Sequence, residues 1–199
     1  DFNSGQIVYA AIGATVEDLY DNPSTASNTT FTIADILKPM ITFSPSDGSQ
    51  GVEVSSNITI TFNEAVRHLD NTALSDLNID ALITLKDTDA NGSDISFDAT
   101  INTDKTIITV DPVIDFSSVQ TVYVAIGASV EDASDNAIDA GTVTFTTKDT
   151  QGPSFIWDPT NGATGVSADA NVTLTFAELV RKVDDTELTD TNVDALLTL

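Results

Sequence analysis

Hydrophobic and polar residues alternate along most of this chain with a period of two. Residues 57–62 read Asn-Ile-Thr-Ile-Thr-Phe, which places three apolar side chains on one face of an extended segment and three polar ones on the other. This alternation predicts a half-buried β-strand. Clusters of Gly, Pro, Asn and Asp separate it from six further predicted strands, at residues 40–43, 81–85, 95–101, 106–110, 120–126 and 142–146.

Seven short strands within about 100 residues are typical of two sheets packed face to face, with the alternate apolar side chains between them. We therefore predict an all-β fold of tandem immunoglobulin-like β-sandwich domains with about seven strands each. A helical pattern is indicated only near residues 70–80, where Ser75 would cap one turn that carries Leu77 and Ile79.

The chain also repeats itself at an offset of 114 residues. Residues 1–35 match the segment 114 positions later at 20 of 35 positions, and residues 36–85 match theirs at 22 of 50. A period of this length is long enough for a whole domain. We expect the C-terminal part of one repeat at 1–37, a complete repeat at 38–151 and the N-terminal part of the next at 152–199. The alternative is a subunit whose strands are donated between neighbouring repeats.

Charge limits the partners of this chain. Seven Lys plus Arg against 31 Asp plus Glu give a net charge of −24, which repels phosphate backbones and anionic lipid surfaces. Nucleic acid is therefore excluded as a partner, whereas divalent cations or a high-salt medium suit such a surface. The chain has no Cys, so disulfides do not stabilise it. No apolar run approaches the roughly 18 residues of a membrane span, and we expect no direct membrane insertion.

Four segments of the sequence resemble a known family. They are SPSDGSQGVEVSSNITITFNEAV at 44–66, its copy DPTNGATGVSADANVTLTFAELV at 158–180, VRHLDNTALSDLNIDALITL at 66–85 and YVAIGASVEDASDNAI at 123–138. These segments are similar to the bacterial Ig-like domain repeats of S-layer proteins, giant surface adhesins and gliding-motility filaments. The resemblance covers the whole chain. It implies a spacer or adhesive module outside the cell, at the bacterial surface, with few residues that do chemistry.

The sharpest chemical motif is D-x-D-x-N-G at residues 87–92. Oxygen ligands at alternate positions before a Gly are how a calcium loop begins, so Asp87, Asp89, Asn91 and Asp94 are candidate Ca²⁺ ligands. The alternative is an ordinary hairpin turn, since Asp, Asn and Gly favour such turns for backbone reasons. Asp98 falls at the twelfth position of the loop, but it belongs to a predicted strand and is expected to project sideways.

A second acidic cluster recurs in both copies. It comprises Glu131, Asp132, Asp135 and Asn136, with counterparts at residues 17, 18, 21 and 22. Asx turns that close the loop before the last strand are one explanation. The other is a Ca²⁺ ion at the junction between repeats, for which the further candidate partners are Asp149 with Asp158, or Asp35 with Ser44. The junctions at 34–39 and 148–153 are short and contain Pro, which limits bending.

The inventory of side chains argues against an enzyme. His68 is the only His, is expected to be exposed, and its counterpart is Lys182, so no His-dependent site repeats. Glu64, three residues before Arg67, is interpreted as an ion pair or an anchor at a strand end. The carboxylates are spread evenly, as solubilising charge would be. We predict no catalytic residue and no cofactor other than Ca²⁺.

These observations predict a structural spacer or stalk repeat of a large bacterial extracellular adhesin or surface filament. Its partners would be neighbouring repeats of the same chain, together with other filament or cell-surface proteins or surface glycans. Two alternatives stay open. One is a module that binds carbohydrate or protein, and the other is an accessory domain of a secreted polysaccharide-degrading enzyme.

Overall fold

The computed structural model describes residues 1–198, so Leu199, the last residue of the predicted third segment, lies outside the described residues. The chain divides into two units, one of residues 1–149 and the other beginning at residue 150. We describe each unit by itself. The residues described contain no helix long and apolar enough to cross a membrane.

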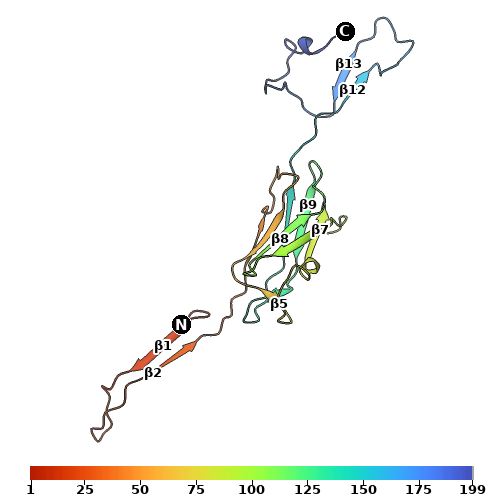
Figure 1. Ribbon diagram of the computed structural model, residues 1–199. Helices are drawn as coiled ribbons and strands as arrows, with labels where there is room; N and C mark the ends of the chain where they lie inside the picture. The colour runs from red at the N-terminus through yellow and green to blue at the C-terminus, as the bar shows by residue number, and fades with distance from the viewer. Residues whose placement is uncertain (199) are drawn as a thin grey trace. The chain divides into compact units, whose positions relative to one another are not determined.

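A β-sandwich forms the centre of the first unit (Figure 1). Its larger sheet has the order β3-β4-β8-β7 and its smaller sheet the order β11-β9-β6, and every pairing is antiparallel. The all-β prediction is confirmed. The strands are β3 (Ile41–Ser44), β4 (Ile58–Phe62), β6 (Ile83–Asp87), β7 (Phe97–Ile101), β8 (Ile107–Pro112), β9 (Thr121–Ile126) and β11 (Gly141–Thr146).

The core lies between these two sheets because one face of each strand is apolar. In β4, Ile58, Ile60 and Phe62 are buried, as the alternation predicts. They belong to one hydrophobic cluster with inner-face residues of β6, β8, β9 and β11, such as Val124 and Phe145. The burial of this contiguous apolar surface is the main stabilising contribution to the sandwich.

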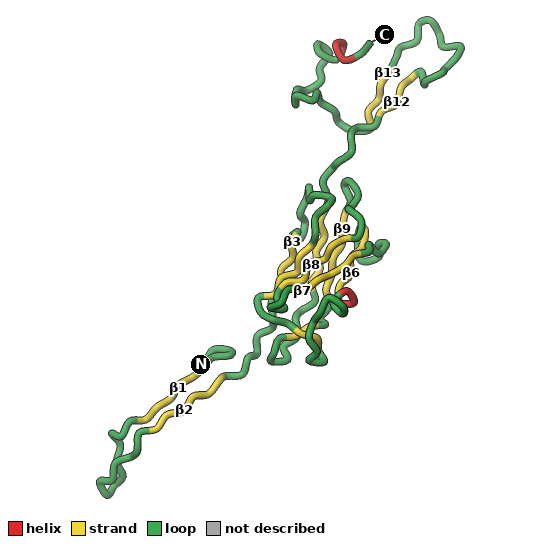
Figure 2. Tube along the Cα trace, viewed as in Figure 1, coloured by secondary structure: helices red, strands yellow, loops and turns green. Residues whose placement is uncertain are grey.

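Two features of the sandwich were not predicted from the sequence. Two-residue strands β5 (Arg67–His68) and β10 (Val130–Glu131) pair with each other, which leaves His68 half-buried instead of exposed. The helical turn is a 3₁₀ turn at Asp80–Leu82 (Figure 2), with no side-chain cap, so the turn predicted with Ser75 as cap is wrong. The backbone N–H of Ser75 instead donates to the side chain of Asn78.

In the edge strand β7, two backbone N–H groups that do not pair with β8 donate to side chains. Asp80 accepts a hydrogen bond from the backbone N–H of Ala99, and Asp76 accepts one from the N–H of Ile101. Both carboxylates lie in or just before the 3₁₀ turn. They occupy donors that an edge strand otherwise offers to another strand.

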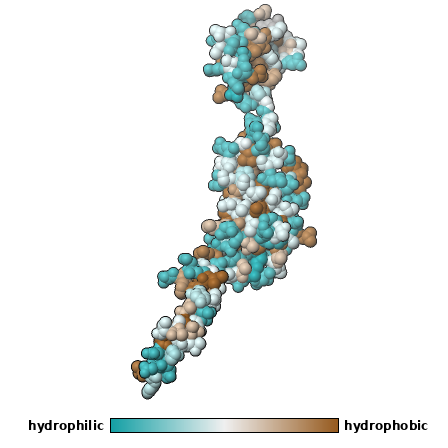
Figure 3. Space-filling model, turned by 60° about the vertical axis from the view of Figure 1, so that its left-hand side comes forward, coloured by the Kyte–Doolittle hydropathy of each residue, from teal (hydrophilic) through white to brown (hydrophobic). Residues whose placement is uncertain are grey.

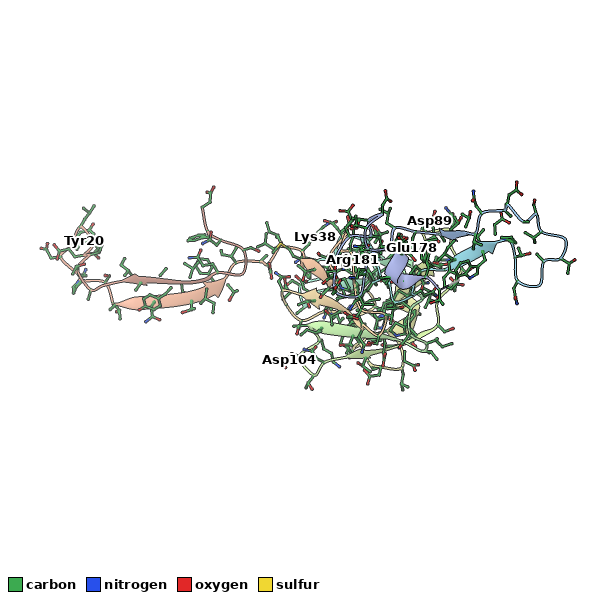
Figure 4. The ribbon with its side chains drawn as sticks, turned by 90° about the horizontal axis from the view of Figure 1, so that it is seen from above. Tyr20, Lys38, Asp89, Asp104, Glu178 and Arg181 are labelled. Atoms are coloured by element: carbon green, nitrogen blue, oxygen red, sulfur yellow. The ribbon has the colours of Figure 1, made fainter. Side chains whose placement is uncertain are left out.

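Before the sandwich, β1 (Ile7–Ile12) and β2 (Ser27–Thr32) form an antiparallel hairpin. Ile12 pairs with Ser27, as Ile126 pairs with Gly141 at the same offset of 114 residues in β9 and β11. The hairpin is thus a copy of the β9–β11 pair, in the same register. Hydrophobic residues, drawn in brown, lie on its surface (Figure 3), and Tyr20 lies at the tip of its loop (Figure 4).

The second unit copies the start of the sandwich. Its strands β12 (Phe155–Asp158) and β13 (Thr173–Phe176) pair with Phe155 opposite Phe176, as Ile41 pairs with Phe62 in β3 and β4. A 3₁₀ turn follows at Asp194–Leu196, matching the turn at Asp80–Leu82. The same local sequence pattern therefore gives the same strands and turn in both places.

Candidate functional site

The predicted calcium loop forms the turn between β6 and β7. Within it the backbone N–H of Asn91 donates to Asp89 Oδ1 at 2.7 Å, and the N–H of Gly92 donates to the Asp89 carbonyl at 3.0 Å. This is the Asx turn that Asp and Gly favour on backbone grounds. Gly92 is required there because an added Cβ would lie 1.5 Å from the Asp87 carbonyl oxygen.

The four candidate ligands of this loop have different partners. Lys86 Nζ lies 2.8 Å from Asp94 Oδ1, and the side chain of Gln120 donates to Asp87 Oδ1 at 3.3 Å. Asp98 is exposed in β7 and stands apart from the loop. Among residues 1–198, the carboxylates of this loop do not form a group within 4.8 Å of one another. Calcium binding at Asp87, Asp89, Asn91 and Asp94 stays a prediction.

The second acidic cluster is organised around Asp132. Its Oδ1 accepts hydrogen bonds from the backbone N–H groups of Ser134 and Asn136, at 2.7 and 2.9 Å, and its Oδ2 accepts one from the Asn136 side chain. Asp18 accepts the equivalent bonds in the first copy. Asp135 adopts a positive φ of 65°, which Asp tolerates better than most residues. The recurring residues therefore build an Asx turn in both copies.

Asp132 also belongs to a cluster of three carboxylates. One oxygen each of Asp35, Glu64 and Asp132 lie within 4.8 Å of one another. Asp35 comes from the junction before the sandwich, Glu64 follows β4, and Asp132 is buried in the turn after β10. The sequence offered Asp149 and Asp158 as partners for the Asp132 cluster and placed Asp35 with the earlier copy, so neither the pairing of Asp35 with Asp132 nor the part of Glu64 was predicted. The retained Glu at 64 and 178 was the signal that pointed to it.

The interpretation of Glu64 as the partner of Arg67 is wrong. Arg67 Nε lies 3.3 Å from Glu131 Oε1, and its Nη2 lies 2.6 Å from Asp135 Oδ1. These two carboxylates come from β10 and the turn after it, which the pairing of β5 with β10 places beside Arg67. Arg67 therefore neutralises charge in the turn and leaves Glu64 with the two other members of its cluster.

Electrostatics separate the members of the carboxylate cluster. Burial, followed by the charges of Asp132 and Asp35, raises the pKa of Glu64. Burial opposes ionisation of Asp132 too, but hydrogen bonds from Asn136 and Ser134 and the charge of Arg67 outweigh it and lower the pKa of that carboxyl. A proton therefore binds to Glu64 before Asp132. Carboxylate oxygens are also the ligands that Ca²⁺ takes, so a cation at these atoms would relieve the same repulsion.

The junction between the hairpin and the sandwich is fixed by hydrogen bonds around Asp35. The hydroxyl of Ser4 donates to Asp35 Oδ1 at 2.7 Å, and the side chain of Asn136 donates to the Asp35 carbonyl at 3.2 Å. Near the end of the junction, Lys38 forms an ion pair with Asp139. The hydrogen bond from Ser4 joins Asp35 to the first copy, and the hydrogen bond from Asn136 joins it to the sandwich.

The comparisons with known proteins concern the sandwich. A family model described as bacterial Ig-like domain matches residues 37–147, more than half of the chain. Among solved structures, the crystal structure of CopC from Methylosinus trichosporium OB3b is similar, at 18% sequence identity and a TM-score of 0.39, over 57% of this chain and 97% of that one. No curated protein matches the sequence.

Proposed function

We propose, from the premise that this chain belongs to the bacterial Ig-like domain family, that it serves as a structural spacer of a bacterial extracellular adhesin or surface filament. One observation carries this proposal. The strand registers of β3–β4 and of β9–β11 recur 114 residues away, in β12–β13 and in β1–β2. Domains of one kind placed in series lengthen a molecule without adding chemistry, which is the task of a stalk.

The junction between copies supports a stalk. Residues 33–40 separate β2 from β3, and Asp35 within them is hydrogen-bonded on both sides, to Ser4 and Asn136. Pro39 is buried at the end of this segment and restricts the residue before it. A short junction with these contacts bends less than a Gly- and Ser-rich linker, in keeping with a spacer that holds a distant tip.

Surface chemistry supports a role without catalysis. His68 is half-buried in β5, and its ring has no repeated counterpart, since residue 182 is Lys. A groove beside β6 and β7 is lined by the charged residues Asp80, Lys86 and Asp94 and by aliphatic and small polar residues, with Phe97 as its one aromatic. Tyr20, an exposed aromatic at the hairpin tip, is Ser134 in the next copy. A repeated sugar-binding site would keep such a residue.

Force spectroscopy of residues 38–151 between handle domains tests the proposal. We expect one cooperative unfolding event with a contour length of about 40 nm, less the length of the folded domain, since each extended residue spans up to about 3.6 Å. This result would also support 38–151 as the domain boundary. Gradual extension without such an event would contradict a load-bearing repeat. Saturable binding of the full chain to a surface glycan, at a site common to both copies, would favour the binding-module alternative.

A further inference from the structure

The β1–β2 hairpin leaves an apolar face uncovered. Ile12 is 51% exposed and Phe31 is 42% exposed. Their counterparts in the sandwich, Ile126 and Phe145, are each 1% exposed, because the rest of the sandwich, residues 38–114, covers them. The second copy therefore shows what kind of surface belongs on this face, namely the remaining strands of an Ig-like repeat.

Most residues that are buried in the β9–β11 copy are identical in the β1–β2 copy. Eleven residues between positions 115 and 149 are buried in the sandwich, and seven of them are identical in the first copy. The pairs are Phe116 and Phe2, Val122 and Val8, Ile126 and Ile12, Val130 and Val16, Glu131 and Glu17, Asp132 and Asp18, and Phe145 and Phe31. Identity at buried positions, combined with identical strand register, indicates a partner segment of the same type as 38–114.

The remaining buried positions differ in size. Val124, which is fully buried, is replaced by Ala10 in the first copy, and buried Ile138 is replaced by Ser24. Both changes remove apolar volume from the inner face. Placed against residues 38–114, the first-copy hairpin would leave cavities at these two points, and unfilled cavities in a core are destabilising.

Two further positions exchange polar for apolar groups. Thr147 is buried, and its hydroxyl donates to the Ser117 carbonyl at 2.7 Å and accepts from the Gln120 N–H at 2.8 Å. The first copy has Ile33 there, which makes neither bond. Val143 is buried, and its counterpart is Thr29. A Thr at position 143 would bury its hydroxyl in a place that Val143 fills with an apolar side chain, and a buried hydroxyl without a hydrogen-bond partner is destabilising.

Gly141 supplies a steric difference. A Cβ at this position would lie 2.3 Å from the end of the Ile41 side chain and 3.1 Å from the ring of Phe43. The first copy has Ser27 at this position. A Ser at position 141 would therefore require the flexible end of Ile41 to shift and the ring of Phe43 to give way slightly.

We propose that the inner face of the β1–β2 hairpin is completed by strands of an Ig-like repeat that differs from residues 38–114 where it meets positions 10, 24, 27, 29 and 33. This partner segment has larger apolar side chains opposite Ala10 and Ser24, and more space opposite Ser27. The last two strands of one repeat, such as β1–β2 or β9–β11, therefore do not fit the sandwich of the next repeat. This mismatch suppresses the exchange of strands between neighbouring repeats. This inference rests on the proposed function as a spacer of tandem repeats. It adds that each two-stranded hairpin fits the remaining strands of its own repeat better than those of another repeat.

Two grafts in the full chain test this specificity. The first replaces residues 115–149 by the sequence of residues 1–35. The second is the same graft, except that Val124, Ile138, Gly141, Val143 and Thr147 are kept, so it carries only the ten remaining differences. The matched control carries the five changes alone, V124A, I138S, G141S, V143T and T147I. Thermal unfolding of the sandwich is followed by circular dichroism for all four chains, including the original.

We expect the first graft and the five-change control to lower the midpoint by about 15 °C or more, or to abolish cooperative unfolding. The second graft should unfold cooperatively near the original midpoint. A first graft as stable as the original chain would overturn the specificity. A second graft that fails to fold would overturn the assignment of the hairpin to a partner like 38–114. Neither result changes the force response of residues 38–151, which tests the proposed function separately.

Discussion

Arg67 Nε lies 3.3 Å from Oε1 of Glu131, whose side chain is only 7% exposed. Glu131 sits in the two-residue strand β10, and Arg67 is its neighbour across the pairing with β5. Removal of the guanidinium would leave a carboxylate buried without its partner, which is costlier than the loss of an exposed ion pair.

We therefore expect Arg67→Ala to lower the free energy of unfolding by about 3 kcal/mol. Arg181→Ala is the matched control, since the side chain of Arg181 is 69% exposed and pairs with exposed Asp185. It should change the free energy by less than about 1 kcal/mol. Urea denaturation of the full chain at pH 7 measures both. Equal effects of the two substitutions would show that burial of Glu131 contributes nothing.

Asp80→Ala should destabilise the sandwich by about 1–3 kcal/mol, because it leaves the N–H of buried Ala99 without its acceptor. The same substitution at Asp194, the counterpart in the second unit, provides the control. Urea midpoints give the stability, and light scattering on heating reports whether the β7 edge then pairs between molecules. If both variants match the original chain, water satisfies this N–H as well as the carboxylate does.

Glu64→Gln should stabilise the protein at pH 7. Because the pKa of Glu64 is raised in the folded state, folding favours its protonated form, and ionisation of this group costs stability as the pH rises. The advantage of the substitution should therefore shrink as the pH falls from the raised pKa of folded Glu64 towards the ordinary glutamate pKa of about 4.3, and be absent below it. Exposed Glu178 allows the control Glu178→Gln. The test is thermal unfolding from about pH 4 to about pH 8, a range that includes the ordinary glutamate pKa. An advantage of Glu64→Gln that did not depend on pH would contradict a raised pKa of Glu64.

The calcium prediction for residues 87–94 has a direct test. Ca²⁺ should raise the thermal midpoint of the full chain at fixed ionic strength, and Asp89→Asn should abolish the rise. Exposed Asp104 lies in a different loop, and Asp104→Asn should preserve the rise. An unchanged midpoint in the original chain would leave the loop as the Asx turn that its hydrogen bonds describe. A rise lost only in Asp132→Asn would place the ion at the junction instead.

The strands of the sandwich could be predicted because their alternation is local. Residues 57–62 specify β4 without reference to any other segment. β5 and β10 were missed because two residues are too few to show a period, and because their pairing joins two segments that lie far apart in the sequence. The 3₁₀ turn was misplaced by a few residues, since Asn78 bonds to the backbone N–H of Ser75 and favours a turn over a capped helix.

The candidate site was less predictable for a related reason. Asp132 and its Asx turn are specified by neighbours in sequence and repeat in both copies. The approach of Glu64 to Asp35 and Asp132 depends on the folding of three separate segments. The sequence pattern around Glu64 suggested a local pair with Arg67, whereas the β5–β10 pairing places Arg67 beside Glu131. Contacts between segments far apart in the sequence therefore determine both the carboxylate cluster of Glu64 and the ion pair of Arg67.

The carboxylates of Asp76 and Asp80 also bear on how molecules behave in a crowd. Two sandwiches that met along β7 would bring these like charges together at the same edge, in a chain that already carries a charge of −24. The repulsion acts before any backbone pairing forms. The two carboxylates that satisfy donors at this edge of one molecule therefore also keep a second molecule from pairing there, so such chains can stay separate at high concentration.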